Sequence, residues 1–189
     1  MSEFVHLHVH SEYSLLDGLS KIPLLLDRAK RQNMKALALT DHGAMYGAIK
    51  FYLKSREMGI KPIIGVEAYQ AGRSRFDKVA SADKDQFHLL LLAKTTEGYH
   101  NLMKLVTQSH LEGFYYKPRL DWELLQRYHQ GIIATSACLQ GVVSQSILGG
   151  DLPAAKTYLE KMQDMFGDDF YLEVQYHPTI KVQTTATEA

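Results

Sequence analysis

Cysteine is almost absent from this sequence, since Cys138 is the single thiol in 189 residues. An internal disulfide framework is therefore excluded, and the composition fits a reducing compartment. Long apolar runs are also missing, because no stretch approaches the roughly 20 residues that span a bilayer. The first residues show no basic region followed by an apolar one, so no signal peptide is expected. These absences favour a cytoplasmic protein with no membrane partner.

Net charge is absent as well, because 21 Lys and Arg residues balance 21 Asp and Glu residues. The chain therefore cannot coat nucleic acid by charge alone. Two local basic clusters, Arg73/Arg75/Lys78 and Lys117/Arg119, are interpreted as solvated loops. Hydrophobic residues make up 46% of the chain, which is enough for a real core, and the length suggests one domain.

Short apolar runs alternate with longer amphipathic segments along the chain. Strands are expected at residues 4–9, 35–40, 61–69, 87–93, 132–137 and 170–175. Helices are expected at residues 22–32, 46–58, 97–111, 122–128, 141–148 and 153–166. Ser20, Thr96 and Asp121 are the candidate caps for three of these helices. This rhythm predicts an α/β fold of parallel βα units, either a barrel or part of one.

Two segments lack a core pattern. Residues 71–85 are too polar for a core element and are expected to form a loop. Residues 181–189 (KVQTTATEA) are polar and rich in threonine, which indicates a frayed tail or an artificial junction. The domain is therefore expected to occupy residues 1–180.

Three histidines stand at alternate positions near the start of the chain: His6, His8 and His10 in HLHVH. Strand side chains alternate between faces, so the three imidazoles should point the same way. Neutral imidazole is a common ligand for zinc and related ions. The alternative is a polar strand face with hydrogen-bonded histidines, but the spacing favours a metal site.

Further candidate ligands follow at the ends of the next predicted elements. Asp17 stands in a turn, from which its carboxylate can swing back over the first strand. Asp41 and His42 stand where the second strand ends, the usual place for active-site groups in βα barrels. Asp41 is interpreted as a helix cap and His42 as the ligand. Glu67 lies inside an apolar strand, where an unpaired carboxylate would be costly and a metal or cation would relieve the cost.

Two residues stay ambiguous on their own pattern. His88 precedes four leucines on a buried strand, where a hydrogen-bonded core histidine is the commoner role. It also stands at the start of its strand, at the wrong end of a simple parallel arrangement. Cys138 could be a nucleophile before a helix, a metal ligand or a small buried side chain. The remaining histidines are interpreted as structural or exposed: His100, His110, His129 and His177.

Mixed nitrogen and oxygen donors from several strand ends predict more than one divalent ion. Two such ions can clamp a phosphate and activate water, so phosphoester hydrolysis is the reaction class that best uses the site. The sequence has neither a Gly-rich phosphate loop nor a Ser-His-Asp order, so covalent serine chemistry is unsupported.

Several stretches of the sequence resemble the motifs of one known family. HLHVHSEYSLLDG, LTDHG, GIKPIIGVEAY, FHLLLLAK and SACLQG are similar to successive motifs of the PHP (polymerase and histidinol phosphatase) family. GFYYKPRLDWELL and TTEGYHNLMKLV resemble the branch that forms the N-terminal domain of bacterial replicative DNA polymerases. The resemblance runs from about Phe4 to His177.

The resemblance implies a distorted seven-stranded βα barrel that holds two or three divalent ions, with Zn, Mn or Fe preferred and Mg possible. The residues that match the family's ligands are His8, His10, Asp17, His42, Glu67, His88 and Cys138. Of these, His10, Asp17, His42 and Glu67 are the candidate catalytic residues. His6 does not match a ligand and is expected to orient or pack behind the site. The family's last motif, an Asp-x-His pair, has no match in these residues, so the barrel is expected to be truncated at its C-terminal end.

The resemblance implies three functions in order of preference. The first is a metal-dependent phosphoesterase that acts as a 3′→5′ exonuclease on a DNA 3′ end. The second is a non-catalytic domain that docks the rest of the polymerase subunit or a separate proofreading exonuclease subunit. The third is a phosphatase of the histidinol-phosphate type, against which the polymerase-like segments argue.

Overall fold

The computed structural model describes residues 4–15, 17–176 and 179–188. Its strands are β1 Ala36–Leu39, β2 Lys61–Ala71, β3 Gln86–Ala93, β4 Phe114–Tyr115, β5 Lys117–Leu120, β6 Ile132–Thr135 and β7 Phe170–Tyr171. Its helices are α1 Ile22–Arg31, α2 Ala48–Glu57, α3 Thr96–Leu111, α4 Trp122–Tyr128, α5 Val142–Leu148, α6 Leu152–Phe166 and α7 Lys181–Glu188, with a 3₁₀ turn at Gly167–Asp169.

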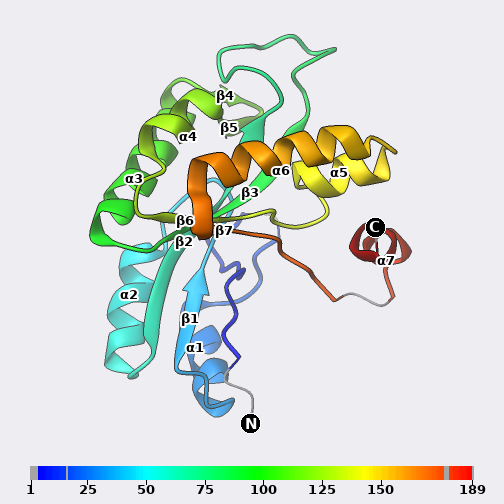
Figure 1. Cartoon of the computed structure of the whole chain (residues 1–189). Helices are drawn as coiled ribbons and strands as arrows, with labels where there is room; N and C mark the ends of the chain where they lie inside the picture. Colours follow the sequence, from blue (N-terminus) through cyan, green and yellow to red (C-terminus); the bar gives the residue numbers. More distant parts are fainter. Residues whose placement is uncertain (1–3, 16, 177–178, 189) are drawn as a thin grey trace.

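The long strand β2 is the centre of the sheet because it pairs with three other strands (Figure 1). Its first residues pair in parallel with β1, its last residues pair in parallel with β5, and its other edge pairs with β3. The order is β4-β5-β2-β3-β6-β7, with β1 beside β2. The fold is therefore mixed α/β. Within the described residues this order has open ends, so these pairings do not show a closed seven-stranded barrel.

The direction of β3 corrects the sequence prediction. β3 runs antiparallel to both β2 and β6, with Tyr69 opposite His88 and Leu90 opposite Thr135. The expectation of parallel strands throughout is therefore wrong. The physical reason is the segment 72–85, which contains no helix and returns the chain as a long hairpin. A parallel strand would need a crossover connection, usually a helix.

Two apolar clusters hold the helices against the strands. In the larger cluster, α3 packs Leu102 and Leu105 against Leu89 and Leu91 of β3, and all four side chains are fully buried. In the smaller cluster, α1 and α2 pack around β1 through residues such as Phe51. Figure 1 shows α2, α3 and α4 together along one side of the strands. Each fully buried Leu or Phe contributes about 1.5–3 kcal/mol, so these clusters fix the strands that carry the site.

The N-terminal segment lies beside β1 without forming a regular strand. The carbonyl oxygens of His6 and Val9 accept hydrogen bonds from the N–H groups of Ala38 and Thr40. The N-terminal segment therefore advances three residues, from His6 to Val9, where β1 and the residue after it advance two, from Ala38 to Thr40. The extra residue is accommodated by a bend of the backbone at His8. The strand expected at residues 4–9 is wrong, and the alternation that would align the three histidines is broken.

The helix caps agree with the sequence prediction at one of three positions. Asp121 caps α4, as expected, by accepting a hydrogen bond from a backbone N–H three residues on. Thr95, not Thr96, caps α3 in the same way. Lys21, not Ser20, precedes α1 and makes no side-chain cap.

The basic clusters are only partly solvated. Arg73 and Lys78 are exposed, as expected, but Arg75 and Arg119 are buried, so their interpretation as solvated loops is wrong. Arg75 contacts three carboxylates, those of Glu112, Asp121 and Glu123. Arg119 donates to four backbone oxygens, those of Arg75, Asp77, Asp83 and Gly113. These contacts order the segment 72–85 against β5.

The polar tail also differs from the sequence prediction. Residues 181–188 form α7, which lies against α5 and buries Gln183, so the expected frayed end is wrong for these residues. Among the described residues, no helix is both long and apolar enough to cross a bilayer.

Candidate metal centre

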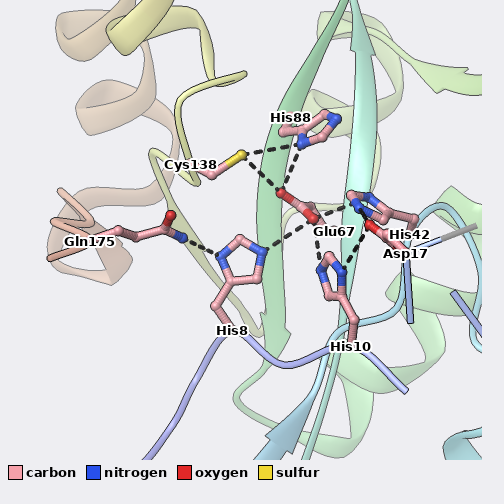
Figure 2. A pocket seen from close by; sticks show the side chains of 8 residues that line it. All are labelled: His8, His10, Asp17, His42, Glu67, His88, Cys138 and Gln175. Atoms are coloured by element: carbon pink, nitrogen blue, oxygen red, sulfur yellow. Dashed lines mark hydrogen bonds and ion pairs between the residues drawn. The ribbon is translucent and has the colours of Figure 1, made fainter. Parts of the chain in front are cut away.

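All seven candidate ligands line one cavity of about 390 Å³. Figure 2 shows Glu67 in the middle of the group, with the other side chains converging on it. The cavity-lining residues are His8, His10, Asp17, His42, Glu67, His88, Cys138 and Gln175. The sequence prediction named every member of this set except Gln175.

The site gathers side chains from elements far apart in the sequence. His42 follows β1 and forms an isolated parallel bridge with Glu67 of β2. His88 stands at the start of β3, and the antiparallel direction of that strand brings it beside Tyr69 and onto the face of β2 that carries Glu67. The backbone N–H of His88 also donates to Gln140 in the turn that carries Cys138. The strand direction therefore removes the difficulty of placing His88 with the other ligands.

Glu67 contacts five of these side chains although only 1% of its own side chain is exposed. Its Oε2 lies 3.1 Å from His8 Nε2, 2.8 Å from His10 Nε2 and 3.1 Å from His42 Nδ1. Its Oε1 lies 2.9 Å from His88 Nδ1 and 3.4 Å from Cys138 Sγ. The two oxygens of this buried carboxylate therefore face two different groups of side chains, three histidines at Oε2 and a histidine with a thiol at Oε1.

Asp17 provides a second carboxylate on the open side of the cavity. Its Oδ2 lies 2.7 Å from His42 Nε2 and 3.4 Å from His10 Nδ1, and 48% of the side chain is exposed. His10 and His42 therefore each stand between Asp17 and Glu67, with one ring nitrogen toward each carboxylate.

Three buried atoms at the centre are left without a hydrogen bond of acceptable geometry among the described residues: His10 Nε2, His42 Nδ1 and Glu67 Oε2. They lie close enough for ion pairs but are not aligned as donors and acceptors. Buried polar atoms are nearly always satisfied, so an unsatisfied group that converges on one point indicates a missing partner. Three sets of ligand atoms, each within 4.8 Å of one another, are His8/His10/Glu67, His10/Asp17/His42 and His42/Glu67/His88. Nitrogen and oxygen donors in this arrangement fit divalent metal ions.

The ionisation of Glu67 and His8 follows from their mutual contact. Burial raises the pKa of Glu67, but the close contacts of its carboxylate with the imidazoles of His10, His8 and His88 outweigh burial and hold that pKa far below its ordinary value. Burial lowers the pKa of His8, but the hydrogen bond to Glu173 and the close contact with the Glu67 carboxylate outweigh burial and raise it to about 10. Without metal, protonated His8 is therefore paired with the carboxylates of Glu67 and Glu173, and a metal ion that binds His8 must displace its proton.

Cys138 is not placed as an activated nucleophile. Burial and the charge of Glu67 raise the pKa of its thiol to about 12. The helix that follows, α5, begins only at Val142, so Cys138 does not stand at its N-terminus. A bound cation would deprotonate a coordinating thiol, so the geometry favours a ligand role over a nucleophilic one.

Two residues near the ligands have other roles than expected. His6 is exposed and packs edge-on against Phe4, so it neither lines the cavity nor orients a ligand. Asp41 is not a helix cap, because α2 begins at Ala48. Its buried carboxylate instead accepts hydrogen bonds from the backbone and hydroxyl of Ser11 and from the hydroxyl of Ser14. Asp41 therefore fixes the turn between His10 and Asp17.

Replacing Asp41 with asparagine should lower the melting temperature of the chain by about 4–8 °C. The amide keeps one acceptor oxygen but loses the charge and the second acceptor, which costs about 2 kcal/mol, and each kcal/mol shifts the melting temperature of a domain this size by about 2–4 °C. Thermal unfolding followed by circular dichroism measures the change. Asp27→Asn, on the exposed face of α1, is the control. Equal melting temperatures for the two variants would contradict the role of Asp41.

The other histidines lie away from the cavity, as expected. His110 Nε2 bonds to the carbonyl oxygen of Gly43, and His129 Nδ1 bonds to the carbonyl oxygen of Gln126. His100 is exposed on α3, and His177 lies outside the described residues.

The sequence prediction missed Glu173 and Gln175. Glu173 Oε1 lies 2.6 Å from His8 Nδ1, and Gln175 lines the cavity beside it. A signal was present, because these polar residues alternate with the apolar Leu172, Val174 and Tyr176. Such alternation is typical of an extended segment with one polar face.

A mixed α/β domain with a cluster of histidines, carboxylates and one thiol defines the class of protein, a candidate multi-metal domain. The PHP domain family matches residues 6–177 of this chain. The chain therefore belongs to the PHP domain family, which confirms the resemblance seen in the sequence.

Curated relatives narrow the branch of the family. The chain is 51% identical over 177 residues to the DNA polymerase III subunit alpha of Borreliella burgdorferi, covering 93% of this chain and 15% of that protein. It is 47% identical over 179 residues to the subunit of Aquifex aeolicus (92% and 15% covered) and 48% identical over 179 residues to that of Thermus aquaticus (93% and 15% covered). The chain thus spans about 15% of these relatives, at their N-terminal end.

Solved structures show partial likeness. An amidohydrolase from Chromobacterium violaceum is 23% identical, with a TM-score of 0.42 and coverage of 57% of this chain and 33% of the other. A protein from Bifidobacterium adolescentis described as a metal-dependent phosphoesterase is 17% identical, with a TM-score of 0.41 and coverage of 58% and 34%.

Proposed function

We propose that this domain is a metal-dependent phosphoesterase that acts as a 3′→5′ exonuclease on DNA, within the alpha subunit of a bacterial DNA polymerase III. The observation that carries the proposal is the convergence of three unsatisfied buried atoms, from His10, His42 and Glu67, on one point. The relatives support the polymerase context. DNA synthesis itself, the DNA 3′ end, the rest of the alpha subunit and a proofreading exonuclease subunit are parts of the proposal, as is a cytoplasmic location.

The residues proposed to hold two or three divalent ions are His8, His10, Asp17, His42, Glu67, His88 and Cys138. Their nitrogen, oxygen and sulfur donors suit Zn, Mn or Fe better than Mg, which prefers oxygen. Divalent ions in such a site polarise a phosphoester and lower the pKa of water. Within the chain, Glu67 supplies the buried negative charge that holds the histidines together. Asp17, about half exposed, faces the open side of the cavity from which a DNA end would enter.

We also propose that the sheet is part of a distorted barrel. Leu172 and Val174 beyond β7, together with Tyr176, are exposed on the side opposite Glu173 and Gln175. An exposed apolar row beside an open edge of a sheet suits a further packed element. The support is the burial pattern of this segment.

One observation favours a non-catalytic docking domain as the second candidate. His8 lies between Glu67 and Glu173 and pairs with both, so in its protonated form it offsets part of their negative charge. The cluster can therefore stabilise the fold through ion pairs without performing hydrolysis.

Replacing His10 with alanine should separate the two candidates. Loss of a residue behind a ligand typically costs 10–100-fold in metal affinity or activity, so loss of a ligand should cost at least about 100-fold. The measurement joins metal analysis of the purified chain with an exonuclease assay on a 3′-mismatched primer. The control is His100→Ala, which removes an exposed histidine from α3. A wild-type chain without bound metal, or hydrolysis unchanged in the His10 variant, would overturn the catalytic proposal.

A further inference from the structure

Glu173 makes the shortest contact to a candidate ligand from outside the cavity. Its Oε1 lies 2.6 Å from Nδ1 of His8, on the side of the ring that faces away from Glu67. Only 15% of the Glu173 side chain is exposed. Glu173 does not line the cavity, so it stands behind His8 and not beside it.

The Glu173 carboxylate is itself held in place from the other side. The hydroxyl of Thr135, at the end of β6, donates to Oε2 at 2.6 Å. The backbone N–H of Glu173 donates to the hydroxyl of Ser136 at 2.9 Å, and the amide of Gln175 donates to Oε1 at 2.8 Å. Every hydrogen bond to this carboxylate therefore agrees with its acting as an acceptor for His8.

These bonds also anchor His8 to the turn that carries Cys138. The same Thr135 hydroxyl accepts a hydrogen bond from the backbone N–H of Ala137, which has a left-handed backbone with φ of 57°. Cys138 follows directly. One chain of contacts thus joins the N-terminal segment, β6 and the segment after β7, three parts of the chain that are remote in sequence.

The chemical consequence concerns which nitrogen of His8 keeps its lone pair. A neutral imidazole carries one N–H, and a carboxylate that accepts from Nδ1–H leaves Nε2 as the free donor atom. In His8 that atom is the one that faces Glu67 Oε2 at 3.1 Å. Gln175 Nε2 lies 3.3 Å from His8 Nδ1 but only 2.8 Å from Glu173 Oε1. The amide of Gln175 therefore donates its hydrogen bond to the Glu173 carboxylate and leaves His8 Nδ1 free to donate to the same carboxylate.

We propose that Glu173 is a positioning residue that fixes the ring of His8 and directs its Nε2 into the metal cavity. The inference rests on the proposed metal site and adds a residue that acts through His8. Glu173 does not bind metal itself in this assignment.

The test is zinc affinity of the 189-residue chain, measured by competition with a chromophoric chelator. Glu173→Ala should weaken zinc binding about 10–100-fold. Glu173→Gln should weaken it less than Glu173→Ala, because the amide oxygen can still accept from Nδ1. Glu160→Gln, on the exposed face of α6, is the control and should match the wild type. Circular dichroism of the zinc-free variants shows whether they are folded.

A double variant distinguishes positioning from general loosening of the fold. If Glu173 acts through His8, Glu173→Ala should have no further effect on zinc affinity in a His8→Ala background. An equal loss in both backgrounds overturns the inference, as does a Glu173→Ala affinity within threefold of the wild type. Thr135→Val gives a second route, because it leaves Glu173 in place but removes the hydroxyl that holds it, and it should show a smaller loss of the same kind. A wild-type chain that binds none of zinc, manganese and iron would instead overturn the proposed metal site, and this inference with it.

Discussion

Glu67→Gln should abolish the stabilisation of the chain by divalent metal. Among the described residues, Glu67 is the one carboxylate that faces His8, His10 and His42 together, and its side chain is 1% exposed. The amide of glutamine has no charge, and its NH₂ group would point at nitrogen atoms that must keep their lone pairs for the metal. Loss of a residue that only hydrogen-bonds to a metal ligand typically costs about 10–100-fold in metal affinity. We therefore expect the affinity of the Glu67→Gln variant for divalent metal to fall by more than about 100-fold.

The loss of metal affinity can be measured as a change in melting temperature with and without metal. A wild-type chain in metal at 100 times its dissociation constant gains about 2.7 kcal/mol of stability. For a domain of this size that gain raises the melting temperature by roughly 5–11 °C. The Glu67→Gln variant should show almost no rise under the same conditions. Glu57→Gln, an exposed change on α2, should keep the full rise. A rise in the Glu67 variant equal to that of the wild type would show that metal binds elsewhere.

Several of the candidate ligands could be predicted from the sequence because they stand in short motifs of unusual composition, whereas His88 and Cys138 are assigned only through the family resemblance. His8 and His10 alternate in an apolar context, and Glu67 interrupts an apolar strand. The geometry of His88 could not be derived in this way. Hydrophobic pattern gives the position of a strand but not its direction, and the direction of β3 decides which end of it meets Glu67.

Other features depend on tertiary contacts that leave little local signal. His6 follows the same alternation as His8 but is exposed, because the backbone bends between His6 and His10. Asp41 has the sequence position of a helix cap, yet its partners are hydroxyls from an earlier turn. Such partners become visible only when the fold has brought the two segments together.

Arg119 is the clearest case of a residue whose environment opposes its local pattern. An arginine beside a polar loop is normally exposed, but Arg119 is fully buried and donates to four backbone oxygens from 2.8 to 3.2 Å. Three of those oxygens belong to the segment 72–85, which links β2 to β3. The arginine therefore ties down the connection between the strands that carry Glu67 and His88.

Arg119→Met should consequently be among the most destabilising single changes in the chain. Methionine has a suitable apolar stem and avoids burying a charge, and replacing a whole buried ion pair by apolar residues is often neutral. Here the partners are backbone oxygens that no substitution can remove, so they would stay buried without donors. Each unsatisfied group costs about 1–3 kcal/mol, and we expect a total loss of about 3–5 kcal/mol, or roughly 6–20 °C in melting temperature.

The site at which the Arg119→Met variant is first cleaved by a protease provides a sharper test than the fall in its melting temperature. If Arg119 orders the segment 72–85, trypsin should cut the Arg119→Met variant at the exposed Lys78 and at Lys84 well below its melting temperature, while the wild type resists. Arg127→Met, an exposed change on α4, should leave both the melting temperature and the cleavage pattern unchanged. Because Arg119 also stands opposite Tyr69 where β5 pairs with β2, loosening it should weaken metal binding by letting Glu67 and His88 separate. A variant that melts early but is cut first outside residues 72–85 would assign the stabilisation to some other part of the fold.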